Sequence, residues 1–273
     1  MRALFALVLL LSSARADTPG APAEAQKAAA PIFPPVREEL DGGVIDWTTW
    51  KLEASAGSER MVGAWKDRRV QEQDALDRLA PRILTLAPQV RVTPDATAGE
   101  LMSKENDLGQ RLREGLSTWR VVETRYISAG RVEMDATMDL IEWLRPALVS
   151  LGSDAAPAPG PGDATGVLVD VRGLDFKPCM APRLSGEGGE LLFDASSVSV
   201  EAIRRAPPVI YVPDPADPRA MSRAGERPLF ARGVSATEEG EVILDAADLS
   251  ALRGSPDFKS LASSGKLVFV VDP

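Results

Sequence analysis

The sequence predicts an α+β protein with two domains. Three observations support this class: alternating apolar and polar residues at 131–140, apolar residues at helical spacing within 59–83, and a Pro/Gly/Ala segment at 151–163. Alternation with period two is typical of a half-buried strand, and a spacing of three to four residues is typical of an amphipathic helix. The segment 151–163 cannot form a helix or a sheet interior, so it is predicted to be a linker.

This linker separates two regions of different aromatic composition. All five tryptophans precede it and none follows it, which predicts two separate cores. The predicted organisation is a signal peptide at 1–16, a Pro/Ala-rich linker at 17–43, a first α/β domain at 44–150, the linker at 151–163 and a second α+β domain at 164–273.

The first domain is predicted to be a helix-covered sheet of order β-α-β-α-β-β. The expected elements are a strand at 44–55, a helix at 59–80, a strand at 90–93, a helix at 101–116, a hairpin of 119–127 and 131–140, and a short helix at 142–151. Ser58 can cap the first helix, and Pro81 either kinks that helix or starts its last turn. The hairpin is the clearest signal, because its second strand alternates strictly around a short Gly-containing turn.

The second domain is predicted to be richer in strands and to end in a buried one. Strands are expected at 166–171, 190–193, 198–203, 209–212, 229–235, 241–244 and 266–271. Turns are expected at 187–189 and 238–240, and Asp245 with Asp248 predicts a helix start. The segment 266–271 is continuously apolar after its first residue, which is typical of a strand covered on both faces.

The N-terminus is typical of a secretory signal peptide. Arg2 precedes an apolar run from Ala3 to Leu11, and residues 14–16 form an A-x-A cleavage site. The run is shorter than the roughly 20 residues that cross a bilayer. We therefore expect export to the periplasm and a soluble mature chain beginning near Asp17. A lipid anchor is not expected, because no cysteine lies near this site.

The composition excludes several classes of function. The net charge of −9, which becomes −11 once Arg2 and Arg15 are removed, disfavours nucleic acid and anionic lipid as partners. The chain has no histidine and one cysteine, Cys179, which excludes histidine-dependent nucleophiles, histidine-ligated zinc and an internal disulfide. Paired carboxylates, Ser-Lys dyads and oxygen-ligated metals stay open. No catalytic residue, cofactor or metal ion is predicted.

Two groups of charged residues are interpreted as solvated faces. One lies on the hairpin and could instead bind a hard cation with help from elsewhere: Glu133, Asp135 and Asp139. The other lies on a helix and could instead contact an acidic partner: Lys66, Asp67, Arg68 and Arg69.

Other conspicuous residues are given structural interpretations. Asp170, Arg172 and Gly173 follow a strand, but no Gly-rich phosphate loop comes next, so Arg172 is expected to pair with a carboxylate at a strand end. Cys179 has no histidine or second cysteine to activate it and is interpreted as a small packing residue. The tryptophans could form a sugar platform but are interpreted as core residues: Trp47, Trp50, Trp65, Trp119 and Trp143.

The order of elements in the first domain supports a family resemblance. The matching positions are Trp50, Ala54, Gly57, the helix at 61–86, the strand at 90–92 and the hairpin turn at 126–132. Over about residues 45–142 the chain resembles the small outer-membrane lipoprotein family that includes the flagellar proteins FlgP and FlgT. The resemblance implies a ring or disk component between the outer membrane and the motor, without catalytic residues. This chain lacks the lipobox cysteine, as FlgT also does.

The second domain resembles a segment of bacterial envelope proteins. The matching positions are 171–174, 177–178 and 268–272, which read V-R-G-L, K-P and V-F-V-V-D. The expected function is therefore that of a non-catalytic structural or assembly component of the bacterial envelope, periplasmic and peripheral to the outer membrane. Its expected partner is an envelope protein or a second copy. The alternatives are a periplasmic small-molecule or glycan binding module and a carboxylate-dependent hydrolase.

Overall fold

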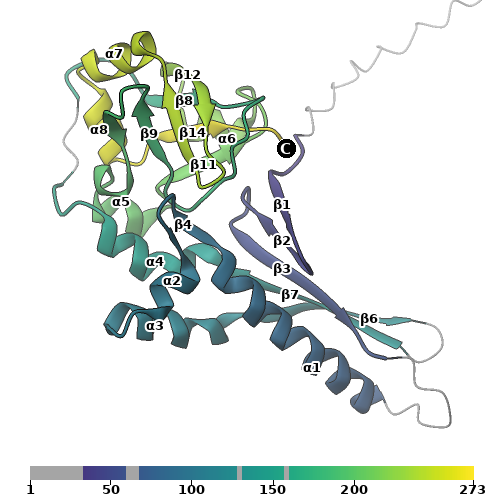
Figure 1. Ribbon diagram of the computed structural model, residues 1–273. Helices are drawn as coiled ribbons and strands as arrows, with labels where there is room; N and C mark the ends of the chain where they lie inside the picture. Colours follow the sequence, from purple (N-terminus) through teal and green to yellow (C-terminus); the bar gives the residue numbers. More distant parts are fainter. Residues whose placement is uncertain (1–32, 60–67, 128–130, 157–159) are drawn as a thin grey trace, which may run out of the picture. The chain divides into compact units, whose positions relative to one another are not determined.

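Two large β-sheets of different design carry the fold (Figure 1). The computed structural model describes residues 33–59, 68–127, 131–156 and 160–273. Within these residues, one sheet has five strands and the other has seven, and helices cover both, so the fold class is α+β as predicted. The signal peptide expected at 1–16 lies outside the described residues.

The five-stranded sheet is antiparallel throughout, with the strand order β1-β2-β3-β7-β6. Its strands are β1 (Arg37–Leu40), β2 (Gly43–Asp46), β3 (Lys51–Gly57), β6 (Arg120–Ile127) and β7 (Arg131–Asp139). The predicted hairpin is confirmed as β6 and β7. The alternation along β7 is confirmed as well, because its apolar side chains are buried: Val132, Met134, Ala136 and Met138.

Helix α1 (Arg68–Leu86) packs against β3 and β7 of this sheet. Ala75, Leu79 and Ile83 are four residues apart, which places them on one side of the helix, and all three are fully buried. Pro81 lies inside α1 and the helix continues past it, so the predicted end at residue 80 is too early. Residues 60–67 of the predicted helix lie outside the described residues.

The strand expected at 44–55 is interrupted by a turn, and this prediction is wrong. The carboxylate of Asp46 accepts hydrogen bonds from the backbone N–H groups of Thr48 (2.9 Å) and Thr49 (3.0 Å). This local bonding competes with the ladder and ends β2. Trp50 then takes a φ of 58°, which is rare for a residue with a side chain. Strand β1 also falls inside the segment expected as a linker at 17–43.

The helix expected at 101–116 is two helices, so this prediction is also wrong. The elements between α1 and the end of the predicted first domain are η1 (Ala87–Gln89), β4 (Arg91–Thr93), β5 (Ala96–Thr97), α2 (Ala98–Ser103), α3 (Asp107–Gly115), η2 (Leu116–Thr118) and α4 (Leu140–Leu151). The side chain of Asn106 caps α3 by accepting a hydrogen bond from the N–H of Gly109 at 2.9 Å. A Cβ at Gly109 would lie 2.1 Å from the carbonyl oxygen of Lys104, so only glycine fits this corner.

The seven-stranded sheet is mixed, with the strand order β10-β9-β13-β12-β8-β14-β11. The four strands from β12 to β11 run parallel, whereas β13 is antiparallel to β12 and β10 is antiparallel to β9. Its strands are β8 (Gly166–Asp170), β9 (Arg183–Gly186), β10 (Leu191–Phe193), β11 (Val209–Val212), β12 (Pro228–Ala236), β13 (Glu241–Leu244) and β14 (Leu267–Val270). Strand β14 runs parallel to β8 on one side and β11 on the other, and all four of its residues are buried. The predicted doubly covered strand is confirmed.

Helices cover both faces of this sheet. They are η3 (Ala195–Ser197), α5 (Val200–Arg205), α6 (Pro218–Ala224), α7 (Ala246–Gly254) and α8 (Phe258–Ser263). On one face, α6 packs against β8, β11 and β14 around a small cluster that includes Val268 and Ala224. Asp245 caps α7 by accepting from the N–H of Asp248 at 2.8 Å, which confirms the predicted helix start.

The strand expected at 198–203 is a helix, so this prediction is wrong. The hydroxyl of Ser199 accepts a hydrogen bond from the N–H of Ala202 at 3.1 Å and thereby starts α5. Val198 and Ile203 are both buried, but Val198 precedes α5 and Ile203 lies within it. Strand β9 and the helices α6 and α8 were not expected from the sequence pattern.

Residues Phe33–Pro273 form one compact unit with a continuous core. An aromatic cluster crosses the expected domain boundary: the ring of Tyr211 lies 6.0 Å from that of Trp47, 5.7 Å from Trp50 and 5.8 Å from Phe269. The backbone N–H of Met180 also donates to the carbonyl oxygen of Arg91 at 3.0 Å. The expectation of two separate cores is therefore wrong.

Candidate functional site

The acidic residues of the hairpin are divided between two structural roles. Asp135 lies on the exposed face of β7, where the guanidinium of Arg125 contacts it through both nitrogens. These hydrogen bonds lower the pKa of Asp135. Glu133 lies 3.3 Å from Arg131, whereas Asp139 caps α4 by accepting from the N–H of Glu142 at 2.8 Å. Glu133 and Asp135, which were predicted to lie on a solvated face, are half-buried and paired with arginines.

Asp170 and Arg172 form the ion pair expected at a strand end. The Nη2 atom of Arg172 donates to Asp170 at 2.7 Å, and this contact lowers the pKa of the carboxyl group. Gly173 has a φ of 78° and its N–H donates to Asp272 at 2.7 Å. Asp170 therefore serves to close the loop after β8.

Cys179 is a buried packing residue, as interpreted. Burial raises the pKa of its thiol to about 12, so the thiolate is not populated at neutral pH. Its backbone is tied to Tyr211, whose hydroxyl donates to the carbonyl oxygen of Cys179 at 2.7 Å.

The tryptophans are mainly core residues, as interpreted. Trp47, Trp50 and Trp143 are buried, and the indole N–H of Trp143 donates to the carbonyl oxygen of Leu112 at 2.9 Å. Trp119 is half-buried, and Trp65 lies outside the described residues.

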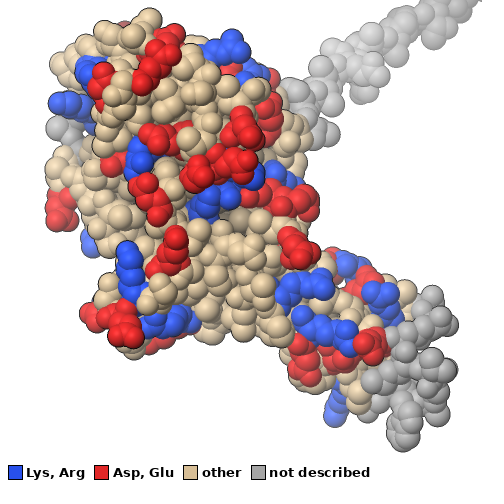
Figure 2. All heavy atoms as spheres, viewed as in Figure 1, with Lys and Arg blue, Asp and Glu red and all other residues tan. Residues whose placement is uncertain are grey.

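The charged cluster at 66–69 is only partly described. The guanidinium of Arg68 lies 4.4 Å from the centre of the Tyr126 ring, and the Tyr126 hydroxyl donates to Glu72 at 2.6 Å. Arg68 thus joins α1 to β6. Lys66 and Asp67 lie outside the described residues. Figure 2 shows basic and acidic side chains interspersed on the face in view, without a large area of one sign.

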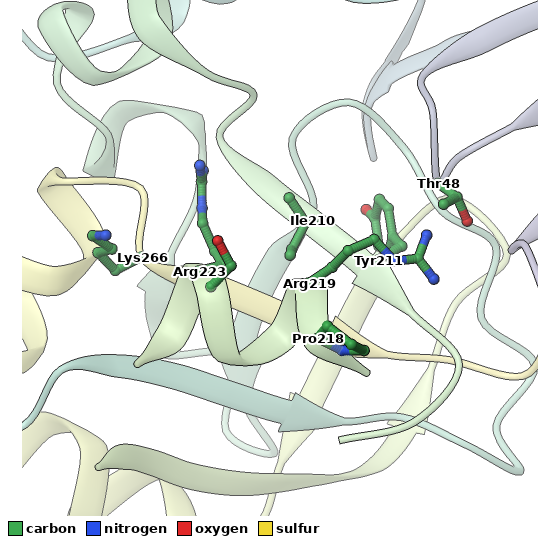
Figure 3. A pocket seen from close by; sticks show the side chains of 8 residues that line it. Thr48, Ile210, Tyr211, Pro218, Arg219, Arg223 and Lys266 are labelled. Carbon is green, nitrogen blue, oxygen red and sulfur yellow. The ribbon is translucent and has the colours of Figure 1, made fainter. Parts of the chain in front are cut away.

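A cleft of about 480 Å³ opens where α6 packs beside the edge strand β11 (Figure 3). Its walls include the cationic side chains of Arg219, Arg223 and Lys266, together with Thr48 and Ser222. Arg219 extends toward Tyr211 and Thr48, whereas Arg223 and Lys266 lie at the other end. Among the described residues, no carboxylate lines this cleft.

The cations of the cleft differ in their electrostatic surroundings. Arg219 is paired with the buried Asp217. The carboxylate of Asp217 also caps α6, because it accepts a hydrogen bond from the backbone N–H of Arg219 at 2.9 Å. Arg223 donates to the carbonyl oxygens of Pro207 and Pro208, and burial lowers its pKa to about 10. Within the described part of the chain, its Nε has no hydrogen-bond partner. No carboxylate of the described residues forms an ion pair with Arg223, so the positive charge at this end of the cleft is not balanced within that part of the chain.

The sequence pattern did not identify these cleft residues. The signal available was the spacing of Arg219 and Arg223, which are four apart and therefore on one side of a helix. The spacing is informative only if α6 is known to be a helix, and a helix of seven residues is too short to show a clear period in the sequence.

The second surface feature is the edge strand β6. It lies at the end of the five-stranded sheet and pairs only with β7 among the described strands. Four of its apolar side chains are exposed: Val121, Val122, Tyr126 and Ile127. An edge strand with exposed apolar side chains and unpaired backbone groups is a surface on which another strand can add.

Comparison with known proteins gives one finding on family. Residues 166–273 match the protein-family model described as the second domain of Treponema pallidum Tp0624. No curated protein matches the chain. In the described part of the chain, no helix combines the length and the apolar character that a membrane crossing requires.

Proposed function

We propose that this chain is a non-catalytic, exported protein of the bacterial envelope that acts as a structural or assembly component, of a flagellar or related machine. The observation that carries the proposal is the edge strand β6, an eight-residue strand that ends a sheet and exposes apolar side chains. The signal-peptide pattern at 1–16 and the resemblance of residues 45–142 to the FlgP and FlgT family support the location. The match of residues 166–273 to a bacterial domain family is consistent with it.

The state of the carboxyl groups supports a non-catalytic role. Acid catalysis by a carboxyl group at neutral pH needs a raised pKa. Among the described residues, each carboxyl group with a resolved shift has a lowered pKa, because an arginine, a lysine or a backbone N–H donates to it: Asp74, Asp135, Asp170, Asp217 and Glu238.

A photo-crosslinking amino acid placed at Val122 in living cells tests this proposal. Val122 is 56% exposed on β6, and Leu191, 52% exposed on the other edge strand β10, gives the matched control. We expect adducts at position 122 that contain a second envelope protein, identified by mass spectrometry, and few at position 191. A mature chain that fractionates with the cytoplasm, or equal adducts at both positions, would contradict the proposal.

The cleft beside α6 favours a second candidate function, a binding module for a small anionic molecule. The supporting observation is the set of cationic walls without a lining carboxylate among the described residues. Titration calorimetry with inorganic phosphate and with glucuronate tests this candidate. We expect the exposed Lys266→Ala variant to weaken binding, whereas Lys259→Ala, on α8, leaves it unchanged. Absence of heat with the native chain would rule out both ligands.

A further inference from the structure

The residues of β6 are self-complementary about Thr124. The strand reads R-V-V-E-T-R-Y-I from Arg120 to Ile127. Counting outward from Thr124, Glu123 corresponds to Arg125, and the next positions are Val122 with Tyr126 and Val121 with Ile127. Two copies of β6 that run antiparallel with Thr124 opposite Thr124 would therefore place every glutamate against an arginine and every apolar side chain against another apolar one.

The side chains in this pattern are accessible at the free edge of the sheet. Val122 is 56% exposed, Tyr126 51% and Ile127 41%. Figure 1 shows β6 on the side of β7 away from β3, where no other labelled element lies along it. Exposed apolar residues on a strand edge are unfavourable in isolation and favour pairing.

We propose that β6 pairs with β6 of a second copy of this chain, antiparallel, on a two-fold axis through Thr124. The pairing would join two five-stranded sheets into one continuous sheet, and both copies would use the same surface, as a two-fold interface requires. This inference deepens the proposed function and rests on it in taking β6 as the assembly surface.

The charge of β6 permits pairing with a second copy of this acidic chain. The chain carries a net charge of −9, so contact between most parts of two copies is repulsive. Strand β6 itself holds two arginines and one glutamate, and this edge does not add to the repulsion. The side chain of Glu123 is 58% exposed and contacts Arg125 of its own chain at 3.1 Å, and across the axis it would meet Arg125 of the second copy as well.

The geometry also sets the strength of the dimer. The ladder between β6 and β7 shifts register between Val121 and Glu123, which is a β-bulge. Val122 is the extra residue of this bulge, which twists the edge there, so regular pairing is confined to the residues around the axis, from Glu123 to Arg125. An interface this short is expected to give a weak, reversible dimer rather than a permanent one.

A disulfide across the axis tests the register directly. Paired Cα atoms in an antiparallel ladder are about 4.5 to 5.5 Å apart, within the range that a disulfide spans. Thr124→Cys introduces a thiol into a chain whose own Cys179 is buried and has a raised pKa, so background reaction is low. We expect mild oxidation to convert Thr124→Cys to a covalent dimer and to leave the matched edge variant Leu191→Cys monomeric. Equal yields from the two variants would overturn the proposal.

A charge reversal tests the same axis without a covalent bond. Glu123→Lys would place like charges together twice in each dimer, and we expect sedimentation equilibrium to show self-association weakened by about tenfold or more. Glu187→Lys, in the exposed turn after β9, makes the same change in net charge and is expected to have no effect. Circular dichroism checks that both variants fold. Unchanged association of Glu123→Lys would refute the pairing.

The outcomes separate this inference from the proposed function. A chain that stays monomeric but crosslinks at Val122 to a different envelope protein would refute the self-pairing and leave the assembly role standing. A chain that dimerises through Thr124 but fractionates with the cytoplasm would refute the proposed envelope function and leave the self-pairing of β6 standing.

Discussion

Tyr211 shows how much one buried hydroxyl group can hold in place. It accepts from the backbone N–H of Cys179 at 3.2 Å and donates to the carbonyl oxygen of the same residue at 2.7 Å. Its ring contacts Trp47, Trp50, Phe176 and Phe269. One side chain therefore fixes the loop after β8 against the aromatic cluster.

Tyr211→Phe is expected to lower the free energy of unfolding by about 1 to 3 kcal/mol, because two buried backbone groups lose their partner. Urea denaturation measures the change. The other tyrosine supplies a matched control: Tyr126 is exposed, and Tyr126→Phe is expected to change stability by less than about 0.5 kcal/mol. Equal effects of the two variants would contradict the role assigned to Tyr211.

The thiol of Cys179 predicts a dependence of stability on alkaline pH. Its pKa rises from 9.0 to about 12 on folding, so the folded state holds the proton more tightly than the unfolded state. The contribution is complete below pH 9.0 and is lost as the pH rises toward 12. Between pH 9 and 10.5 the native chain is expected to lose about 2 kcal/mol more than Cys179→Ala. Urea denaturation at both pH values measures these losses. Equal losses of unfolding free energy in the native chain and in Cys179→Ala would contradict the prediction.

At the scale of elements, the turn between β12 and β13 depends on Gly240. This residue has a φ of 103°, and a Cβ there would lie 2.7 Å from the sulfur of Cys179. Gly240→Ala is expected to cost about 2 kcal/mol or more, from backbone strain and the clash together. Gly254, at the end of α7, has open space around it, so Gly254→Ala is expected to be neutral or mildly stabilising. Thermal unfolding of the two variants checks the contrast.

Several strands with a clear pattern were predicted correctly, whereas breaks in a predicted strand and a predicted helix were missed. Strands β7, β13 and β14 follow directly from alternation or from a continuous apolar run. The breaks at Asp46 and Asn106 come from side chains that bond to the backbone, which periodicity does not report. The cleft escaped prediction because α6 is short and Lys266 comes from a distant segment.

At the scale of the whole described unit, side-chain contacts join segments on both sides of the expected domain boundary. Arg91, on β4, contacts Glu38 at 2.7 Å and also donates to the carbonyl oxygen of Pro178 at 3.2 Å. Asp257, after α7, accepts from the N–H groups of Gly162 (2.7 Å) and Ala164 (3.0 Å) in and beside the expected linker. The predicted boundary between the domains at 44–150 and 164–273 relied on composition, which does not reveal such contacts.

We therefore expect residues 33–273 to unfold in one cooperative step. All five tryptophans lie before residue 151, so their fluorescence reports on the region of the five-stranded sheet. Amide hydrogen exchange of β8 and β14 reports on the other sheet. Coincident transitions with urea are expected for a single unit. Loss of protection in β14 at a lower urea concentration than the fluorescence change would contradict it.

The position of β14 has a consequence for how the chain matures. Strands β8 and β11 are held apart until β14 is inserted between them, and β14 ends at Val270. During synthesis, the part of the seven-stranded sheet formed by β8, β14 and β11 therefore cannot close until almost all of the described chain has been made. In the exported protein that we propose, this order of strands would keep that part of the sheet open until late in synthesis.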